Sequence, residues 1–247
     1  MRIAVVADIH GNIRALRAVM EDLKQVAPDR VVNLGDCASG PLEAAETIDV
    51  LMSLAWTTVR GNHDRQLLDR PVEKMGKSDA AAFAELKNHH HAWLSTLEET
   101  ATIEDIFLCH GTPGNDTTYL LETVQPDGQV RLATQAEVSR RLGSEHSPIV
   151  LCGHTHVSRI VRLTDGRTVV NPGSVGLPAY SDREPAPHSM EMGAPHARYA
   201  VLKRAKAAEP WQVSLRVVAY DWEGAAARAA SKGREDWARW IRTGYAN

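Results

Sequence analysis

The sequence predicts an α/β fold in which two β-sheets pack face to face and helices lie outside them. Two observations lead to this prediction. In the first part of the chain, short apolar runs alternate with stretches of helical periodicity, which is typical of a mostly parallel sheet with helices on one face. Further along, apolar strands follow one another around a hairpin signal, which indicates a second, mixed sheet. The 247 residues contain no internal repeat and no linker, so we expect 1–247 to form a single domain.

Five elements near the N-terminus form the parallel part of the fold. In the first helix, Leu16, Val19 and Leu23 recur at helical spacing, and Pro28 lies just beyond its end. The elements predicted here are a strand at 2–7, a helix at 13–26, a strand at 30–34, a helix at 42–54 and a short strand at 56–59. This β-α-β-α-β order predicts parallel strands that lie side by side.

The later part of the chain supplies the second sheet and a closing helix. Asp165-Gly166 stands between two β-branched runs, which is a hairpin signal. The elements predicted are a long helix at 78–97, strands at 103–109 and 149–152, a hairpin of 159–163 and 167–170, strands at 199–202 and 213–218, and a helix at 222–243. Residues 181–197 hold three prolines and show no periodicity, so we expect either a lid or a surface loop there.

Composition and charge exclude several classes of protein. Apolar residues make up 43% of the chain and charged residues 24%, which excludes disorder, collagen and a coiled-coil rod. No apolar run approaches the ~20 residues of a membrane span, and the N-terminus lacks a signal-peptide pattern, so we expect a cytoplasmic protein without a membrane partner. A net charge of -3 argues against specific binding of nucleic acid.

Cysteines and a histidine run are read as structural features. Cys37, Cys109 and Cys152 neighbour polar clusters, but cysteine is a common buried residue, and we expect these three to pack rather than to bind metal. The consecutive histidines 89–91 lie in a helical pattern, where neighbouring side chains point in different directions. We therefore do not expect them to form one metal site.

Residue types that bind metals follow several of the predicted strands. Because ligand sites in open α/β sheets form at the carboxyl ends of the strands, these clusters should meet. Each cluster alone is better explained as a buried core residue, but burying all of them without a cation would be costly. Each stands beside a glycine: Asp8-x-His10, Gly35-Asp36, Gly61-Asn62-His63-Asp64, His110-Gly111 and Gly153-His154-x-His156. Together they predict a metal site.

These clusters, in this order, resemble the motifs of the calcineurin-like metallophosphoesterase superfamily. Asn171-Pro172-Gly173-Ser174 is similar to a further element of that family, and Gly40-Pro41 resembles its small bacterial phosphodiesterase branch. The chain departs from the Ser/Thr protein phosphatases, because no arginine follows Asp36 closely and Asp64 stands where those enzymes have glutamate. The resemblance implies a four-layer α/β/β/α sandwich.

The resemblance also assigns metal ligands. It implies that one ion is held by Asp8, His10, Asp36 and His156, and the other by Asp36, Asn62, His110 and His154. Asp36 would bridge two divalent ions, with Mn first and Fe, Ni, Co or Zn as alternatives. In such a centre the ions lower the pKa of a shared water, and the bridging hydroxide attacks phosphorus.

Further residues are candidates for catalysis and substrate binding. His63 is expected to act as general acid with Asp64 orienting its ring, and the alternative for His63 is a supporting hydrogen bond. Arg60 is either a phosphate contact or an exposed charge at a strand end. If residues 181–197 form a lid, the substrate-binding candidates are Arg183, His188 and His196.

The predicted function is that of a metal-dependent phosphoesterase, with a phosphodiesterase acting on small or nucleotide-type esters as the preferred interpretation. The alternatives are a phosphomonoesterase or Ser/Thr protein phosphatase of the same fold, and a non-catalytic scaffold protein. Scaffold members of this fold typically lose the acid histidine or some ligands, whereas His63 and every ligand are present here. The expected partner is a small phosphoester, and an oligomer is compatible with the sequence.

Overall fold

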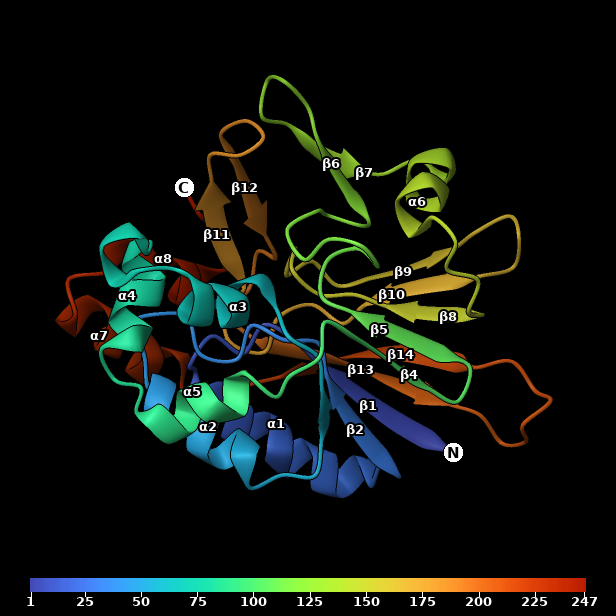
Figure 1. Ribbon diagram of the computed structural model, residues 1–247, viewed down its shortest axis with the longest axis horizontal. Coiled ribbons are helices and arrows are strands. Elements are labelled where there is room, and N and C mark those ends of the chain that lie inside the picture. The colour runs from blue at the N-terminus through green and yellow to red at the C-terminus, as the bar shows by residue number, and fades with distance from the viewer.

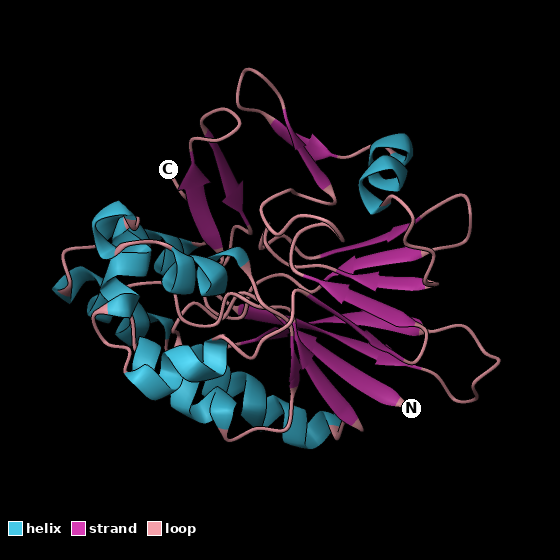
Figure 2. Cartoon of the chain, viewed as in Figure 1, coloured by secondary structure: helices cyan, strands magenta, loops and turns pink.

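Two five-stranded sheets form the centre of the computed structural model, which describes residues 1–247 (Figures 1 and 2). The first sheet has the strand order β14-β13-β1-β2-β3, and the second has the order β4-β5-β8-β10-β9. The strands of the first sheet are β1 (Arg2–Val6), β2 (Arg30–Asn33), β3 (Thr57–Thr58), β13 (Ala197–Lys203) and β14 (Gln212–Val218). Those of the second are β4 (Thr100–Ile103), β5 (Ile106–Cys109), β8 (Ile149–Leu151), β9 (Arg159–Arg162) and β10 (Thr168–Asn171).

The first sheet is parallel where the sequence predicts it, because β1, β2 and β3 run in the same direction. Strand β13 pairs antiparallel with β1, and β14 extends the sheet on that side. Strand β1 is buried on both faces: Val6 packs with Leu16 and Val19 of the first helix, whereas Val5 packs with Leu108 of the second sheet. The hydrophobic effect thus holds this strand between two layers.

Helices cover the outer face of each sheet, which confirms the four-layer order. Helices α1 (Ile13–Val26), α2 (Ala44–Met52) and α5 (Asn88–Leu94) lie beside the first sheet, and α6 (Gln135–Leu142) lies over the second (Figure 1). Asn12 caps α1 by accepting a hydrogen bond from the backbone N–H of Ala15 at 3.1 Å. Helix α1 ends at Val26, shortly before Pro28, as the sequence predicts, and Ala27 follows it in a left-handed conformation.

Several elements gather at the carboxyl ends of the parallel strands. They are α3 (Asn62–Asp69), η1 (Val72–Lys74), α4 (Lys77–Phe83), α7 (Trp222–Ser231), α8 (Glu235–Thr243) and the hairpin of β11 (Ala179–Asp182) with β12 (His188–Glu191). A second small hairpin, β6 (Glu122–Val124) with β7 (Val130–Leu132), stands above the second sheet (Figure 1). No helix is both long and apolar enough to cross a bilayer.

Four predicted elements differ from the structure. The helix predicted at 78–97 is two helices, α4 and α5, and the helix predicted at 222–243 is broken into α7 and α8 at Gly233, whose φ is +72°. The strand predicted at 103–109 begins with a turn at Glu104, which separates β4 from β5. Residues 181–197 are not an aperiodic excursion, because six of them, 181–182 and 188–191, pair in the β11–β12 hairpin.

Candidate metal centre

Five of the seven candidate ligands have a backbone conformation that most residues avoid. Asp8, His10 and Asp36 have φ values of 54°, 51° and 56°, and His154 and His156 have values of 69° and 61°. The left-handed region costs a non-glycine residue of order 1 kcal/mol or more, so this backbone is held by its surroundings. Asp8 and His10 converge in one group of ligand atoms, whereas His154 and His156 lie in different groups. Tight turns, rather than the extended chain that the sequence suggests, position them.

Gly61 lets the segment before α3 approach the turn that contains Asp36. A Cβ atom at this position would lie 2.2 Å from Oδ1 of Asp36 and 2.5 Å from its backbone nitrogen. Only glycine avoids such an overlap with main-chain and carboxylate atoms. Asp64 then ties this segment to that turn, because its carboxylate accepts hydrogen bonds from the backbone N–H groups of Gly61, Asp36 and Cys37.

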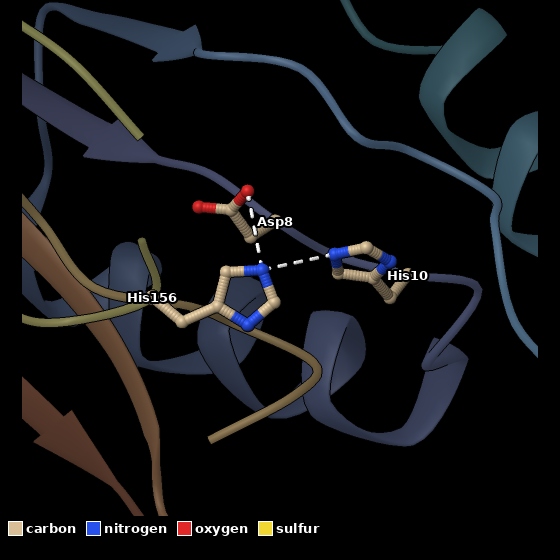
Figure 3. A group of neighbouring side chains, drawn as sticks. All are labelled: Asp8, His10 and His156. Atoms are coloured by element: carbon tan, nitrogen blue, oxygen red, sulfur yellow. Dashed lines mark hydrogen bonds and ion pairs between the residues drawn. The ribbon is translucent and has the colours of Figure 1, made fainter. Parts of the chain in front are cut away.

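Site A, defined as Asp8, His10 and His156, brings three ligand atoms within 4.8 Å of one another. Figure 3 shows these side chains pointing toward one another. The Nε2 atoms of His10 and His156 are 3.1 Å apart, and Nε2 of His156 is 3.5 Å from Oδ1 of Asp8. All three residues are buried.

The two Nε2 atoms of site A carry lone pairs. Nδ1 of His10 donates to the carbonyl oxygen of Ser39 at 2.9 Å, and Nδ1 of His156 donates to that of Leu177 at 2.7 Å. Burial lowers the pKa of His10 to about 4 and the pKa of His156 well below its usual value, so both rings are neutral near pH 7. Two lone pairs and the carboxyl group of Asp8 therefore face one another with no proton between the rings. A bound cation would satisfy all three.

Site B, defined as Asp36, His110 and His154, forms a second group within 4.8 Å. Nδ1 of His110 donates to the carbonyl oxygen of Leu34 at 2.7 Å, so its Nε2 is directed inward. This Nε2 atom lies 3.2 Å from Oδ2 of Asp36 and 3.0 Å from Oδ1 of Asn62. Asn62 thus joins the group as a fourth oxygen or nitrogen donor.

Asp36 lies between the two sites. Its Oδ2 atom is 3.8 Å from Nε2 of His10 in site A as well as next to His110 in site B. Burial raises the pKa of Asp8 to about 8. Burial by itself lowers the pKa of His110, but the carboxylates of Asp36 and Asp8 overcome this and raise it to about 10. The donor set of imidazole, carboxylate and amide fits a divalent transition metal.

His63 lies at the edge of this centre, and its partner is not the residue that the sequence suggests. Its Nδ1 atom donates to Oδ1 of Asp79 at 2.7 Å, and its side chain is 31% exposed. Asp64, predicted to orient this ring, instead holds backbone N–H groups. Burial lowers the pKa of His63, but the carboxylates of Asp36 and Asp79 raise it to about 9.

A cavity of about 1260 Å³ opens over both sites. Its lining includes His63, Tyr119, Tyr180 and Arg183, together with five of the seven candidate ligands: His10, Asp36, Asn62, His154 and His156. Of the substrate-binding candidates, only Arg183 is in its lining. Its position on the tip of the β11–β12 hairpin places an exposed guanidinium at the cavity rim.

Three other candidates lie elsewhere. The guanidinium of Arg60 pairs with Glu99 at 2.9 Å and is not in the cavity lining. His188 is not in the cavity lining but contacts a residue that is, because its Nε2 accepts a hydrogen bond from the hydroxyl of Tyr119 at 3.0 Å. His196 packs on Trp222 with the ring centroids 5.2 Å apart, away from the cavity.

A third group with metal-ligating atoms does not fit a metal. Asp49, His89 and His90 bring their ligand atoms within 4.8 Å. However, Nδ1 of His90 accepts the backbone N–H of Lys87 at 3.0 Å, so its Nε2 carries a proton, which it donates to Asp49 at 2.9 Å. His90 has no free lone pair, and only two donors remain.

The comparisons with known proteins agree with this geometry. The model of the calcineurin-like phosphoesterase superfamily domain matches residues 1–191. An uncharacterized protein of Methanocaldococcus jannaschii is 28% identical over 189 residues, which make up 71% of this chain and 76% of that protein.

Two solved structures share the fold. A metallophosphoesterase from Sphaerobacter thermophilus has a TM-score of 0.76 and 22% identity, and the likeness covers 99% of both chains. A putative diadenosine tetraphosphatase has a TM-score of 0.54 and 16% identity, over 88% of this chain and 94% of that one. Fold, buried ligand groups and family match lead to one conclusion: the chain belongs to the calcineurin-like phosphoesterase superfamily, whose members are metal-dependent phosphoric ester hydrolases.

Proposed function

We propose that the chain hydrolyses phosphodiesters at a centre of two divalent metal ions. The observation that carries this proposal is the pair of unprotonated Nε2 atoms, 3.1 Å apart, in His10 and His156. Such an arrangement of buried lone pairs is favourable only around a cation. The first ion would be held by Asp8, His10, Asp36 and His156, and the second by Asp36, Asn62, His110 and His154.

The position of Asp36 supports a shared ligand. Its Oδ2 atom lies between site A and site B, within 4 Å of a ligand nitrogen in each. Two divalent ions bring four positive charges, of which Asp8 and Asp36 neutralise two, so the centre attracts a phosphate anion. When bound, the ions supply an activated water and polarise the phosphate oxygens. Mn²⁺ is the first candidate, with Fe, Ni, Co or Zn as alternatives.

The protein's own groups then serve the leaving alcohol. His63 lines the cavity beside the ligands, and its Nδ1 is bound to Asp79, which leaves Nε2 to face the substrate. We assign to His63 the role of general acid, which gives a proton to the departing oxygen. The raised pKa of His63, about 9, keeps this ring protonated near pH 7.

The size of the cavity favours a diester over inorganic phosphate or a small monoester. About 1260 Å³ is more than a phosphate group fills, and the rings of Tyr119 and Tyr180 with the cation of Arg183 line the remaining space. A second ester group, of small or nucleotide type, would occupy it. The presence of His63 and all seven candidate ligands argues against a non-catalytic scaffold.

A hydrolysis assay tests this proposal. Metal-free protein is reloaded with Mn²⁺ and compared on bis(p-nitrophenyl) phosphate, p-nitrophenyl phosphate and 2′,3′-cyclic nucleotides. We expect turnover of diesters with metal and none without it. His156→Ala should abolish it, whereas His89→Ala, a matched change of an exposed histidine, should not. Full metal loading without turnover of any ester would overturn the proposal in favour of a scaffold, and faster turnover of the monoester would favour a phosphomonoesterase.

A further inference from the structure

The partner of His63 comes from a part of the chain that no sequence motif marks. Asp79 lies 16 positions after His63, on α4, and its Oδ1 atom is 2.7 Å from Nδ1 of His63. The carboxylate of Asp79 is 2% exposed, so water does not compete for this hydrogen bond. We propose that Asp79 is the positioning residue for His63, holding its ring so that Nε2 faces the substrate. This inference rests on the proposed function, in which His63 protonates the leaving alcohol.

The hydrogen bond fixes two properties of the ring at once. A carboxylate accepts only, so Nδ1 of His63 carries a proton and Nε2 is the atom that exchanges a proton with the cavity. The rotation about the last side-chain bond, which is otherwise soft, is also restricted. The backbone N–H of His63 donates to Oδ1 of Asp36 at 2.9 Å, so main chain and ring are tied to different carboxylates.

Ser39 connects the positioning residue to the metal centre. Its hydroxyl donates to Oδ1 of Asp79 at 2.7 Å, and its carbonyl oxygen accepts from Nδ1 of His10 at 2.9 Å. One residue thus sets the distance between a candidate ligand of site A and the carboxylate that orients His63. Asp79, Ser39 and His10 are all buried, which keeps this chain of hydrogen bonds rigid.

The C-terminal part of the chain holds α4 in place. Arg234 donates to the hydroxyl of Ser78 at 3.1 Å, and its guanidinium lies 5.5 Å over the ring of Trp237. The backbone N–H of Gly40 donates to the carbonyl oxygen of Ser78 at 3.2 Å. Arg234 and Trp237 lie beyond residues 1–191, which the family model matches. The support of Asp79 therefore depends on residues outside the matched region.

The alternative is that Asp79 only anchors α4. The two roles predict different kinetics for a variant that lacks the Asp79 carboxylate. Only the positioning role makes the loss in kcat depend on the leaving group and on the presence of His63. If Asp79 acts through His63, Asp79→Asn should lower kcat roughly 10- to 100-fold with KM nearly unchanged. The loss should shrink for p-nitrophenolate, which leaves without protonation, and grow for alkyl leaving groups. The double variant with His63→Ala should then be no slower than His63→Ala alone.

The matched control is Asp49→Asn. Asp49 forms a close carboxylate–histidine pair away from the candidate metal centre, 2.9 Å from His90, on the surface outside the cavity. Its loss should leave kcat and KM unchanged for every leaving group. Ser39→Ala is the second test variant, because it removes one hydrogen bond to Asp79 and keeps the carboxylate. We expect a smaller loss in kcat with the same dependence on the leaving group.

A measurement without turnover separates this inference from the proposed function. The ring ¹⁵N shifts of His63 in the Zn²⁺-loaded protein, recorded at a pH where the ring is neutral, report which nitrogen carries the proton. We expect a protonated Nδ1 in the wild type and in Asp49→Asn, and a mixture of proton positions in Asp79→Asn at unchanged metal content. If no ester is hydrolysed but these shifts behave as expected, the proposed function fails and the positioning stands. Losses in kcat that add up in the double variant, or unchanged shifts in Asp79→Asn, would overturn the positioning role.

Discussion

The Oδ2 atom of Asp36 lies 3.2 Å from the Nε2 atom of His110, in a site where both side chains are buried. The same oxygen is 3.8 Å from Nε2 of His10, so one carboxylate faces both groups of candidate ligands. A single charge in this position affects both ions at once. Its removal should therefore have a larger effect than the loss of any ligand that faces only one of them.

Asp36→Asn should lower metal content at both sites and abolish turnover. The amide keeps the shape of the side chain and its bond from the backbone N–H of His63, but removes the negative charge that two cations would share. Elemental analysis after dialysis measures the metal, and diester hydrolysis measures the rate. Asp22→Asn, which changes a carboxylate paired with Arg216 outside the cavity, is the control. Two ions per chain with near-normal activity would end the bridging assignment.

Gly61→Ala should displace Asp36 without touching its charge. The added methyl group would meet Oδ1 and the backbone nitrogen of Asp36 at 2.2 and 2.5 Å, and a backbone nitrogen cannot turn away. Overpacking of this kind costs about 1–3 kcal/mol in the free energy of unfolding, measured on the metal-free protein in urea. Metal affinity should fall as well. Gly114→Ala is the control, because a Cβ there meets nothing within 4 Å. Equal stability of the two variants would contradict this account of Gly61.

The strand-end clusters were predictable because the fold brings the carboxyl ends of the strands together. Each cluster closely follows a strand and stands beside a glycine, so a short stretch of sequence is enough to find it. The residues that follow β1, β2, β5 and β8 are Asp8, Asp36, His110 and the pair His154 and His156. The backbone did not follow from the sequence. Extended chain predicts a shared face for Asp8 and His10, whereas their positive φ values are imposed by the bonds of the surrounding turns.

The partner of His63 was not predictable in the same way. Asp79 lies on a short helix, inside a stretch that the sequence predicts as one long helix, and a contact between residues of two different helices leaves no periodic signal. The adjacent carboxylate, Asp64, was the local choice, but a neighbour in sequence on a helix start points elsewhere. The break between α7 and α8 did have a signal, since Gly233 is a position where a helix ends readily.

Metal uptake by the metal-free protein should release protons and strengthen as pH rises. The pKa of Asp8 is raised to about 8 by burial, and the pKa of His110 is raised to about 10 by Asp36 and Asp8 against the effect of burial. Near pH 7 both groups carry a proton that a metal ion must displace, so affinity falls as pH falls.

Calorimetric titration with Mn²⁺ in two buffers of different ionisation enthalpy measures this proton release. The apparent affinity should increase between about pH 6 and pH 8, by up to tenfold per unit for each proton displaced. Asp8→Asn should bind more weakly and release fewer protons. Binding that is independent of pH, with no release, would show that the ligands are already deprotonated in the metal-free protein.

Arg183→Ala should raise KM for diesters without changing kcat or metal content. The guanidinium lines the cavity at the tip of the β11–β12 hairpin, has no carboxylate within ion-pair distance, and lies apart from the candidate ligands. Because Arg183 is exposed, its attraction for a phosphate is screened by water, and an effect of about 0.2–1 kcal/mol is expected, or roughly a 1.4- to fivefold change in KM. The effect should shrink as salt is raised, since an exposed charge acts over about a Debye length. Arg140→Ala, an exposed arginine outside the cavity lining, is the control. Equal KM values for the two variants at low salt would show that the hairpin tip has no role in substrate binding. A loss of bound metal in Arg183→Ala would show that the hairpin stabilises the metal centre instead of binding the substrate.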